Sequence, residues 1–381
     1  MKNKNEIICI NHVPGYMMID ISNALAEEYK TVYLLAGEIR KRSKDLAKNV
    51  RWIKIPKYNP KNTLSRLFTW VIATIRIFFF VLFKSRKVHL FITTNPPFGV
   101  FLPLLLKNRY TILVYDIYPD VLYEYKMLNK NHFIVKWWEK VNVKVLDNAY
   151  RLITIGEGMK SKISSYVSPD KIEIISCWTD SEFLKPVPKS KNKFIVDNKF
   201  EGKFLVLYSG NLGVTHDVEI LVYLAELSKR NNLHFIIIGE GDKKRFIADL
   251  IQERKLSNID LLSWQPVEML PFSLSAADIA VVTLGTGASL MSVPSKLYDT
   301  MAVGSPLLII SEPEAEMARI VEDHNIGRSF QNGQLEEMLD FIYELMDNSE
   351  TYLNFRENAL AASKHFTPYN AKSFKAINKN M

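Results

Sequence analysis

FLVLYSGNLG, residues 204–213, is the stretch that decides the fold, because it begins an alternation that the rest of the chain repeats. Its apolar run ends in a glycine-containing turn, and a helix is predicted over Val218–Lys229. The next run, HFIIIGEGD over residues 234–242, ends in a second glycine turn and precedes another helix. Apolar runs without polar alternation are typical of strands buried on both faces of a sheet. Their alternation with helices predicts parallel βαβ units.

The same alternation extends in both directions and predicts an α/β protein of two Rossmann-like domains, which 381 residues can accommodate. Strand-like runs begin at Ile7, Thr31, Trp52, Val88, Tyr110, Arg151, Lys171, Phe204, His234, Ile259, Asp278 and Pro306. Residues 184–203 are polar and rich in lysine, which indicates a linker. We therefore predict an N-terminal domain over 1–183, a C-terminal domain over 204–350, and C-terminal helices over 351–381 that cross back to the N-terminal domain.

The composition is that of a globular protein in a reducing compartment. Hydrophobic residues make up 48% and charged residues 24% of the chain. Cys9 and Cys177 lie in or at the end of apolar runs, which predicts buried free thiols, and their spacing suits no metal site. The charged start, a short apolar run and a Pro-Gly turn predict a first strand rather than a secretory signal.

The net charge of +8 is unevenly distributed. Residues 38–87 hold fourteen lysines and arginines against two acidic residues, so this segment carries +12 and the remainder −4. Such a local excess indicates either an anionic surface, whether anionic lipid or nucleic acid, or a merely solvated lysine-rich face, and charge alone does not decide between them. No basic and aromatic strand pattern of an RNA-binding module accompanies it, so nucleic acid is the less favoured partner.

An aromatic helix predicted over Arg66–Lys84 favours lipid. Its apolar runs on either side of Arg76 are too short to span a bilayer, and a central arginine would be costly there. Basic flanks and about five apolar turns predict a helix that lies in the membrane interface. The alternative is a core helix packed against a sheet. The residues predicted to contact the membrane are Trp70, Arg76, Phe78, Phe79 and Phe80.

Candidate ligand contacts follow the strands, because ligands bind beyond the carboxyl ends of open parallel sheets. Ser209–Gly213 and His216 follow the first strand of the second domain, and Gly239 and Gly241 follow the next. Glycines let the backbone approach a ligand closely, and a helix start offers N–H groups to a phosphate. Neither turn is a dinucleotide fingerprint or a P-loop, so each alone is a weak indication.

The strongest cluster is VPSKLYDTMAVGSP, residues 293–306. Pro294 suits a helix start, and Ser295 can cap the first turn. Lys296 then lies in the first turn, where it opposes the helix dipole and requires an anionic partner such as a diphosphate. This pattern favours ligand binding over the alternative of a well-capped helix with a solvated lysine.

Several of these segments together resemble the retaining GT-B glycosyltransferases of family 4, in the bacterial branch that builds surface polysaccharides and O-antigens. The resemblance covers nearly the whole chain. It rests on YDIYPD (115–120), KIEIISCWTDSEFLKP (171–186), YSGNLGVTHDVEIL (208–221), IIGEGD (237–242), LSAADIAVVTL (274–284) and PSKLYDTMAVGSP (294–306). It implies a GT-B fold, in which the two parallel sheets face a central cleft.

Motif by motif, the resemblance implies a set of site residues. The catalytic candidates are Asp116, Lys296 and Asp299. The donor-binding candidates are Ser209, Gly210, Asn211, Leu212, Gly213, His216, Gly239, Gly241, Trp264, Gln265, Pro294, Ser295, Lys296, Leu297 and Asp299. The acceptor-binding candidates are His12, Gly15, Asn95 and Asp116. Asp120 is better read as a turn cap, and Trp264 as either a contact to the nucleotide base or a core residue.

The chain also departs from the family pattern. The family commonly has two glutamates eight positions apart, and these positions hold Met291 and Asp299. Its phosphate-binding arginine and lysine align with Asn211 and His216. Asp299 can accept hydrogen bonds from ribose, and His216 can assist Lys296 if protonated. Sugar recognition must then come from elsewhere, for example from the backbone N–H groups of residues 287–290.

The resemblance implies transfer of a sugar, with retention, from a nucleoside diphosphate sugar, expected to be UDP-linked. The acceptor is expected to be a glycan on a polyprenyl diphosphate at the cytoplasmic face of the inner membrane, to which the protein binds peripherally. No Asp-x-Asp motif occurs, so no metal and no cofactor are expected. The alternatives are a non-catalytic GT-B-like subunit that binds a nucleotide sugar or serves as a scaffold, and a soluble sugar-nucleotide epimerase.

Overall fold

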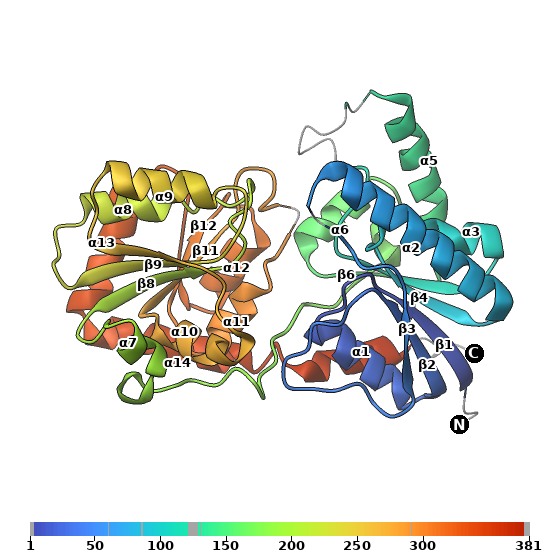
Figure 1. Ribbon diagram of the computed structural model, residues 1–381, viewed down its shortest axis with the longest axis horizontal. Helices are drawn as coiled ribbons and strands as arrows, with labels where there is room; N and C mark the ends of the chain where they lie inside the picture. The colour runs from blue at the N-terminus through green and yellow to red at the C-terminus, as the bar shows by residue number, and fades with distance from the viewer. Residues whose placement is uncertain are drawn as a thin grey trace. The chain divides into compact units, whose positions relative to one another are not determined.

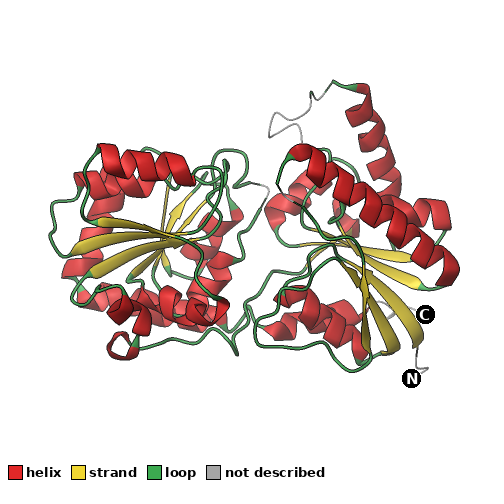
Figure 2. Cartoon of the chain, viewed as in Figure 1, coloured by secondary structure: helices red, strands yellow, loops and turns green. Residues whose placement is uncertain are grey.

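The structure, a computed structural model, describes residues 4–59, 61–84, 87–120, 129, 131–290 and 292–376. The chain forms two compact units (Figure 1). The N-terminal unit comprises Met1–Cys177 with Pro368–Met381, and the C-terminal unit comprises Trp178–Thr367. Each unit contains a parallel sheet covered by helices (Figure 2), so the predicted α/β class with two Rossmann-like domains is confirmed.

The N-terminal unit is built on a seven-stranded parallel sheet in the order β3-β2-β1-β4-β5-β6-β7. Its strands are β1 Lys4–Ile10, β2 Tyr29–Ala36, β3 Val50–Lys54, β4 His89–Thr93, β5 Tyr110–Val114, β6 Arg151–Thr154 and β7 Ile172–Ile174. Its helices are α1 Tyr16–Ala26, α2 Thr63–Lys84, η1 Pro97–Phe101, α3 Leu102–Leu106, α5 Phe133–Asp147, α6 Glu157–Ile163 and η2 Pro169–Lys171. Cys9, in β1, and Cys177, after β7, are both buried free thiols, as predicted.

Two helical layers cover this sheet. Side chains of α2, α3, α5 and α6 share one hydrophobic core with alternate residues of the strands. On the other face, α1 lies beside the final helical turn η5, Pro368–Ala376 (Figure 1). Phe374 of η5 is buried with its ring 5.8 Å from that of Phe91 in β4. The end of the chain therefore completes the core of the N-terminal unit.

Helix α2 has two different faces rather than one uniform apolar surface. Ala73, Ile77 and Val81 are spaced four residues apart, so they lie on one face of the helix. This face is fully buried in the core that the helix shares with the sheet. Trp70 is also buried, with its ring beside those of Tyr58 and Tyr118, so its predicted membrane contact is wrong.

The outer face of α2 is apolar as well. Arg76 and Phe79 are exposed there, whereas Phe78 and Phe80 pack partly against the core, which corrects their predicted membrane contact in part. Further large apolar side chains are exposed at Leu64, Leu67, Phe68, Val71, Ile75, Leu82 and Phe83. Among the described residues, α2 is the one helix whose length and mean hydropathy of 1.9 would permit a membrane span.

The C-terminal unit is built on a six-stranded parallel sheet in the order β10-β9-β8-β11-β12-β13. Its strands are β8 Phe204–Ser209, β9 Leu233–Ile238, β10 Ile259–Leu262, β11 Ile279–Thr283, β12 Leu307–Ile310 and β13 Gly327–Phe330. Its helices are η3 Lys189–Lys191, α7 Lys193–Asp197, α8 Ile220–Leu227, α9 Lys244–Glu253, η4 Val267–Met269, α10 Leu270–Ala276, α11 Lys296–Ala302, α12 Glu316–Asp323, α13 Leu335–Asp347 and α14 Ser349–Ser363.

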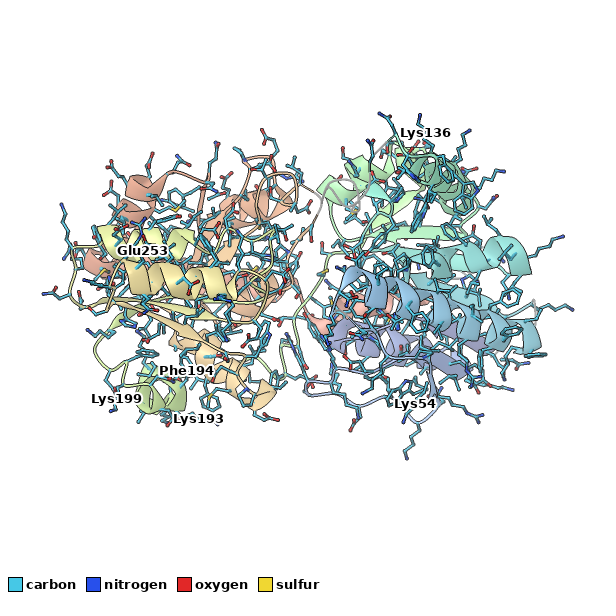
Figure 3. All side chains as sticks on the ribbon, turned by 45° about the horizontal axis from the view of Figure 1, so that its top comes forward. Lys54, Lys136, Lys193, Phe194, Lys199 and Glu253 are labelled. Atoms are coloured by element: carbon cyan, nitrogen blue, oxygen red, sulfur yellow. The ribbon has the colours of Figure 1, made fainter. Side chains whose placement is uncertain are left out.

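The segment predicted as a linker, residues 184–203, is part of the C-terminal unit. Asn192 begins α7 as its N-cap and donates from Nδ2 to the carbonyl of Phe272 at 2.8 Å. Phe194 is fully buried, while Lys193 and Lys199 beside it are exposed (Figure 3). The polar composition thus reflects the outer surface of a packed segment. Helix α14 also belongs to this unit, and the chain returns to the N-terminal unit only from Pro368.

Candidate functional site

The strand order of the C-terminal sheet places its switch point between β8 and β11. From β8 the chain proceeds outward to β9 and β10, and from β11 it proceeds in the other direction to β12 and β13. The loops that leave two such strands diverge and open a crevice at their carboxyl ends, where ligands of open α/β sheets bind. These loops carry the Ser209–Gly213 turn and, after β11, the residues that lead to Lys296.

Lys296 reaches across this switch point to the loop after β8. Its Nζ donates to the Tyr208 hydroxyl at 2.8 Å and lies 3.9 Å from the centre of that ring. A Cβ added to Gly210 would lie only 2.2 Å from Nζ, so the absence of a side chain at Gly210 makes room for the ammonium. Tyr208 was not among the predicted site residues, although it lies within the quoted strand.

The ammonium of Lys296 has no carboxylate partner among the described residues. The residue is half-buried overall, but its charged end is the enclosed part, and burial lowers the pKa of Lys296 to about 7. A lysine held in this way is costly unless an anion pairs with it. This arrangement contradicts the alternative of a freely solvated lysine.

His216 and Lys243 lie on the other side of the same loop. Burial, with the positive charges of Lys296 and Lys243, lowers the pKa of His216 to about 4. His216 is therefore neutral at pH 7, and its predicted role as a protonated partner does not apply in this state. Lys243, by contrast, is paired with Glu219 at 2.8 Å. Lys296 is thus the cation at this switch point that lacks an internal counter-charge among the described residues.

The two predicted glycines after β9, Gly239 and Gly241, pack closely against the backbone of the Ser209–Gly213 turn. A Cβ on Gly239 would lie 1.9 Å from the carbonyl oxygen of Gly210, and one on Gly241 would lie 2.5 Å from the backbone of Leu212. These glycines let the two turns pack against each other, and their structural role is clear without a ligand. Leu212 is fully buried with its N–H bonded to Glu240, so its predicted donor contact is replaced by a core position.

Several residues of the 293–306 cluster have different surroundings from those predicted. Ser295 precedes α11 but makes no side-chain cap, because its backbone is helical there. Leu297 is fully buried in the core, so its side chain is not available to a donor. Asp299 is 95% buried and its Oδ1 accepts from Thr179 Oγ1 at 2.8 Å. Its carboxylate therefore faces a buried segment of its own unit.

The remaining donor candidates lie at or near the surface. Trp264 is 52% exposed, which excludes the core alternative, and Gln265 donates to the Ser263 carbonyl at 3.0 Å. Asn211 is exposed, and Pro294 is half-buried. Met291 lies outside the described residues. Backbone N–H groups of residues 287–290 were predicted to contact the sugar. One of them, Gly287 N, instead donates to Glu312 Oε2 at 2.7 Å.

The N-terminal sheet has its own switch point, between β1 and β4. His12 follows β1 and Asn95 follows β4, and the His12 N–H donates to the Asn95 carbonyl at 2.8 Å. His12 Nε2 lies 2.8 Å from the Pro56 carbonyl, which can only accept, so Nε2 carries the proton. Its Nδ1 and the side-chain oxygen of Asn95 are then buried acceptors without a partner among the described residues. Burial lowers the pKa of His12, so the ring is neutral.

Asp116, unlike His12, is exposed at the carboxyl end of its strand. The hydroxyl of Thr94 accepts from the backbone N–H of Asp116 at 3.1 Å, which orders this turn. Gly15 begins α1 and has open space around its Cα. Asp120 is buried and bonded to the Tyr166 hydroxyl, in agreement with a structural role. No group of three or more potential metal-binding side chains occurs among the described residues.

Comparisons with known proteins identify the C-terminal unit. Residues 189–361 match the family described as glycosyl transferases group 1. The C-terminal unit, Trp178–Thr367, is therefore similar to the group 1 glycosyltransferases over most of its length. The chain is 27% identical over 280 residues to the probable glycosyltransferase WbjE of Pseudomonas aeruginosa, spanning 72% of this chain and 70% of WbjE. The predicted family resemblance is therefore confirmed.

A second curated protein and a solved structure are also similar to this chain. The putative colanic acid biosynthesis glycosyl transferase WcaI of Escherichia coli strain K12 is 28% identical over 184 residues, 46% of this chain and 44% of WcaI. Anabaena HepE, solved in complex with UDP-glucose, aligns with a TM-score of 0.73 at 14% identity, over 97% of this chain and 98% of HepE. At that identity the likeness concerns the fold, and it agrees with the predicted GT-B class.

Proposed function

We propose that this glycosyltransferase moves a sugar from a UDP-linked donor to a lipid-linked glycan, with retention and without a metal, in bacterial polysaccharide assembly. The carrying observation is the Lys296 ammonium, which lies against Gly210 without a carboxylate partner among the described residues. The reaction leaves a diphosphate with growing negative charge, and a preplaced cation is the group that stabilises it. The UDP and UDP-glucose complexes of HepE support the donor, and the colanic acid assignment of WcaI supports the pathway class.

The acceptor would approach from the N-terminal unit. Asp116 is an exposed carboxylate at the carboxyl end of that sheet, and it can orient an acceptor hydroxyl. The neutral acceptor atoms His12 Nδ1 and Asn95 Oδ1 are buried, so Asp116 is a group at this end of the sheet that a hydroxyl can reach. A hydroxyl-bearing glycan is therefore the acceptor class that this end of the sheet supports.

Peripheral binding to the cytoplasmic face of the inner membrane completes the proposal. The outer face of α2 exposes Phe68, Phe79 and Phe83 beside Arg76, within the segment that carries +12. Apolar area with basic flanks is the combination that binds anionic lipid surfaces. The buried contacts of Ala73 and Ile77 favour a helix that lies on the membrane over one that crosses it.

A thermal-shift screen against UDP, GDP, dTDP, CMP and their common sugar conjugates tests the donor. A ligand that binds only the folded state stabilises it, by about 2.7 kcal/mol when the ligand concentration is a hundred times Kd. The melting temperature rises as a result. We expect the largest shift with UDP and UDP-sugars, followed by turnover of one of them. If no nucleotide shifts the transition, the proposed transfer is wrong and the non-catalytic subunit is favoured.

A further inference from the structure

A second polar pocket opens in the C-terminal unit, on the β12 and β13 side of the switch point. It has a volume of about 120 Å³. Leu284 and Ile310, at the ends of β11 and β12, line the pocket but are almost fully buried. Asp217, Glu312 and Gln331 contribute polar surface, and none of them was among the predicted site residues.

Both carboxylates of this pocket are held in fixed orientations. Glu312 Oε2 accepts from Gly287 N at 2.7 Å and from Ser289 Oγ at 2.8 Å. Asp217 Oδ2 accepts from Asn332 Nδ2 at 3.0 Å. Glu312 Oε1 has no hydrogen-bond partner among the described residues, and Asp217 Oδ1 has only Lys243 Nζ, at 3.8 Å. Each acid therefore uses one oxygen for hydrogen bonds within the unit, and its other oxygen accepts no hydrogen bond from the described residues.

The pocket is joined to the loop that faces Lys296. Asp217 follows directly after His216, whose pKa responds to the charge of Lys296. Gly285 N donates to the Thr215 carbonyl at 2.8 Å, which ties the pocket loop after β11 to the loop after β8. A Cβ on Gly285 would lie 3.2 Å from Asp217 Oδ1, so a larger residue at this position would crowd the carboxylate. A ligand group in the pocket would thus sit next to the proposed diphosphate position.

Resting on the proposed function, we infer that this pocket binds one neutral, hydroxyl-rich sugar ring. The free oxygens of Asp217 and Glu312 accept from sugar hydroxyls, and the Gln331 amide can both donate and accept. Two carboxylates disfavour an anionic sugar such as a uronic acid. The ring could be supplied by the donor or by the acceptor glycan, and these sources can be distinguished.

Isosteric amide variants test the pocket without disturbing the fold. In Glu312→Gln and Asp217→Asn, the retained oxygen can still accept the internal bonds, while the pocket-facing oxygen becomes an N–H donor. Glu314→Gln is the matched control, because Glu314 is exposed on the same loop and does not line the pocket. Calorimetry would compare UDP, UDP-glucose, UDP-galactose, UDP-N-acetylglucosamine and UDP-glucuronic acid. Methyl glycosides of the three neutral sugars would be titrated by ligand-observed NMR into protein with and without UDP.

If the donor supplies the ring, both variants lose about tenfold in affinity for a neutral UDP-sugar and keep their affinity for UDP. In each variant, the affinity for UDP-glucuronic acid then comes closer to that for the neutral UDP-sugars, because one carboxylate charge has been removed. If the acceptor supplies it, UDP-sugar affinities are unchanged and the variants lose binding of a methyl glycoside. Unchanged affinities in both titrations overturn the inference, whereas UDP binding by the wild type leaves the proposed function standing. Methyl glycoside binding by a wild type that binds no nucleotide would retain the pocket and reject the proposed function.

Discussion

At the switch point of the C-terminal sheet, Lys296 places a positive charge against a glycine, whereas at that of the N-terminal sheet His12 and Asn95 are neutral and their free acceptor atoms are buried. Both crevices arise from the same reversal of strand order. The fold therefore supplies two equivalent positions, and the side chains give them different chemistry. One suits a diphosphate and the other suits hydroxyls, which is the division of labour that sugar transfer needs.

The largest expected effect comes from Lys296→Met. Loss of the cation should lower turnover by a factor of roughly a hundred to a thousand and abolish the thermal shift with UDP. The same variant should raise the melting temperature of the free protein by a few degrees, because it removes an enclosed ammonium that lacks a carboxylate partner among the described residues.

Lys243→Met is the matched control for that experiment. Lys243 is paired with Glu219, so its loss leaves a carboxylate unpaired and should lower the melting temperature instead. If both variants destabilise the protein equally and both still bind UDP, Lys296 is a structural lysine and the contrast between the two crevices fails.

The next largest effect concerns the other crevice. Asp116→Asn should lower kcat about a hundredfold while UDP affinity stays within about twofold, because the exposed Asp116 is proposed to orient the acceptor. Asp120→Asn, at a buried acid bonded to Tyr166, should instead lower stability. A loss of UDP affinity in Asp116→Asn would contradict the assignment of donor and acceptor to separate crevices.

Sequence reasoning predicted the sheets, most helices and the position of Lys296 in the first turn of a helix, because periodicity and turn residues are local signals. Helices expected over Ser295–Val303 and Val218–Lys229 occur as Lys296–Ala302 and Ile220–Leu227, and differ only at their ends. Burial was harder to predict. Leu212 and Leu297 stand beside site residues in sequence, yet both side chains point into the core.

Long-range partners explain most of the remaining differences. The bonds of Asp299 to Thr179 and of Glu312 to Gly287 depend on tertiary packing, which no spacing rule encodes. The linker prediction failed for a similar reason. Residues 184–203 have a linker's composition, but Phe194 and Asn192 attach the segment to α10, and composition does not reveal such contacts.

A pH titration gives a smaller, graded effect. Burial lowers the pKa of Lys296 to about 7 in the empty site, and a bound diphosphate must raise it. Affinity for a nucleotide sugar is therefore full below pH 7 and falls as the pH rises towards the pKa of the bound state, by up to about tenfold per unit. Calorimetry between pH 7 and pH 9 would measure this slope and the proton taken up on binding.

Lys296→Arg is the control for the titration, because a guanidinium stays protonated throughout this range. Its affinity can differ from that of the wild type, but its slope above pH 7 should vanish. A wild-type slope that persists in the arginine variant would assign the titration to another group and remove Lys296 from the diphosphate site.

The smallest expected effect tests whether the N-terminal unit meets a membrane. Phe79→Ser should weaken binding to anionic vesicles about three- to tenfold, because a half-exposed ring contributes only part of the free energy of a buried one. Phe246 in α9 is the matched control, since it is 49% exposed against 48% for Phe79 but belongs to the C-terminal unit. Equal losses in the two variants, measured by co-sedimentation, would mean that surface hydrophobicity in general causes the binding. A loss confined to Phe79→Ser would place the lipid-binding surface on α2, in the same unit as the crevice proposed to receive the acceptor, so that a lipid-linked glycan would be brought to the unit that uses it.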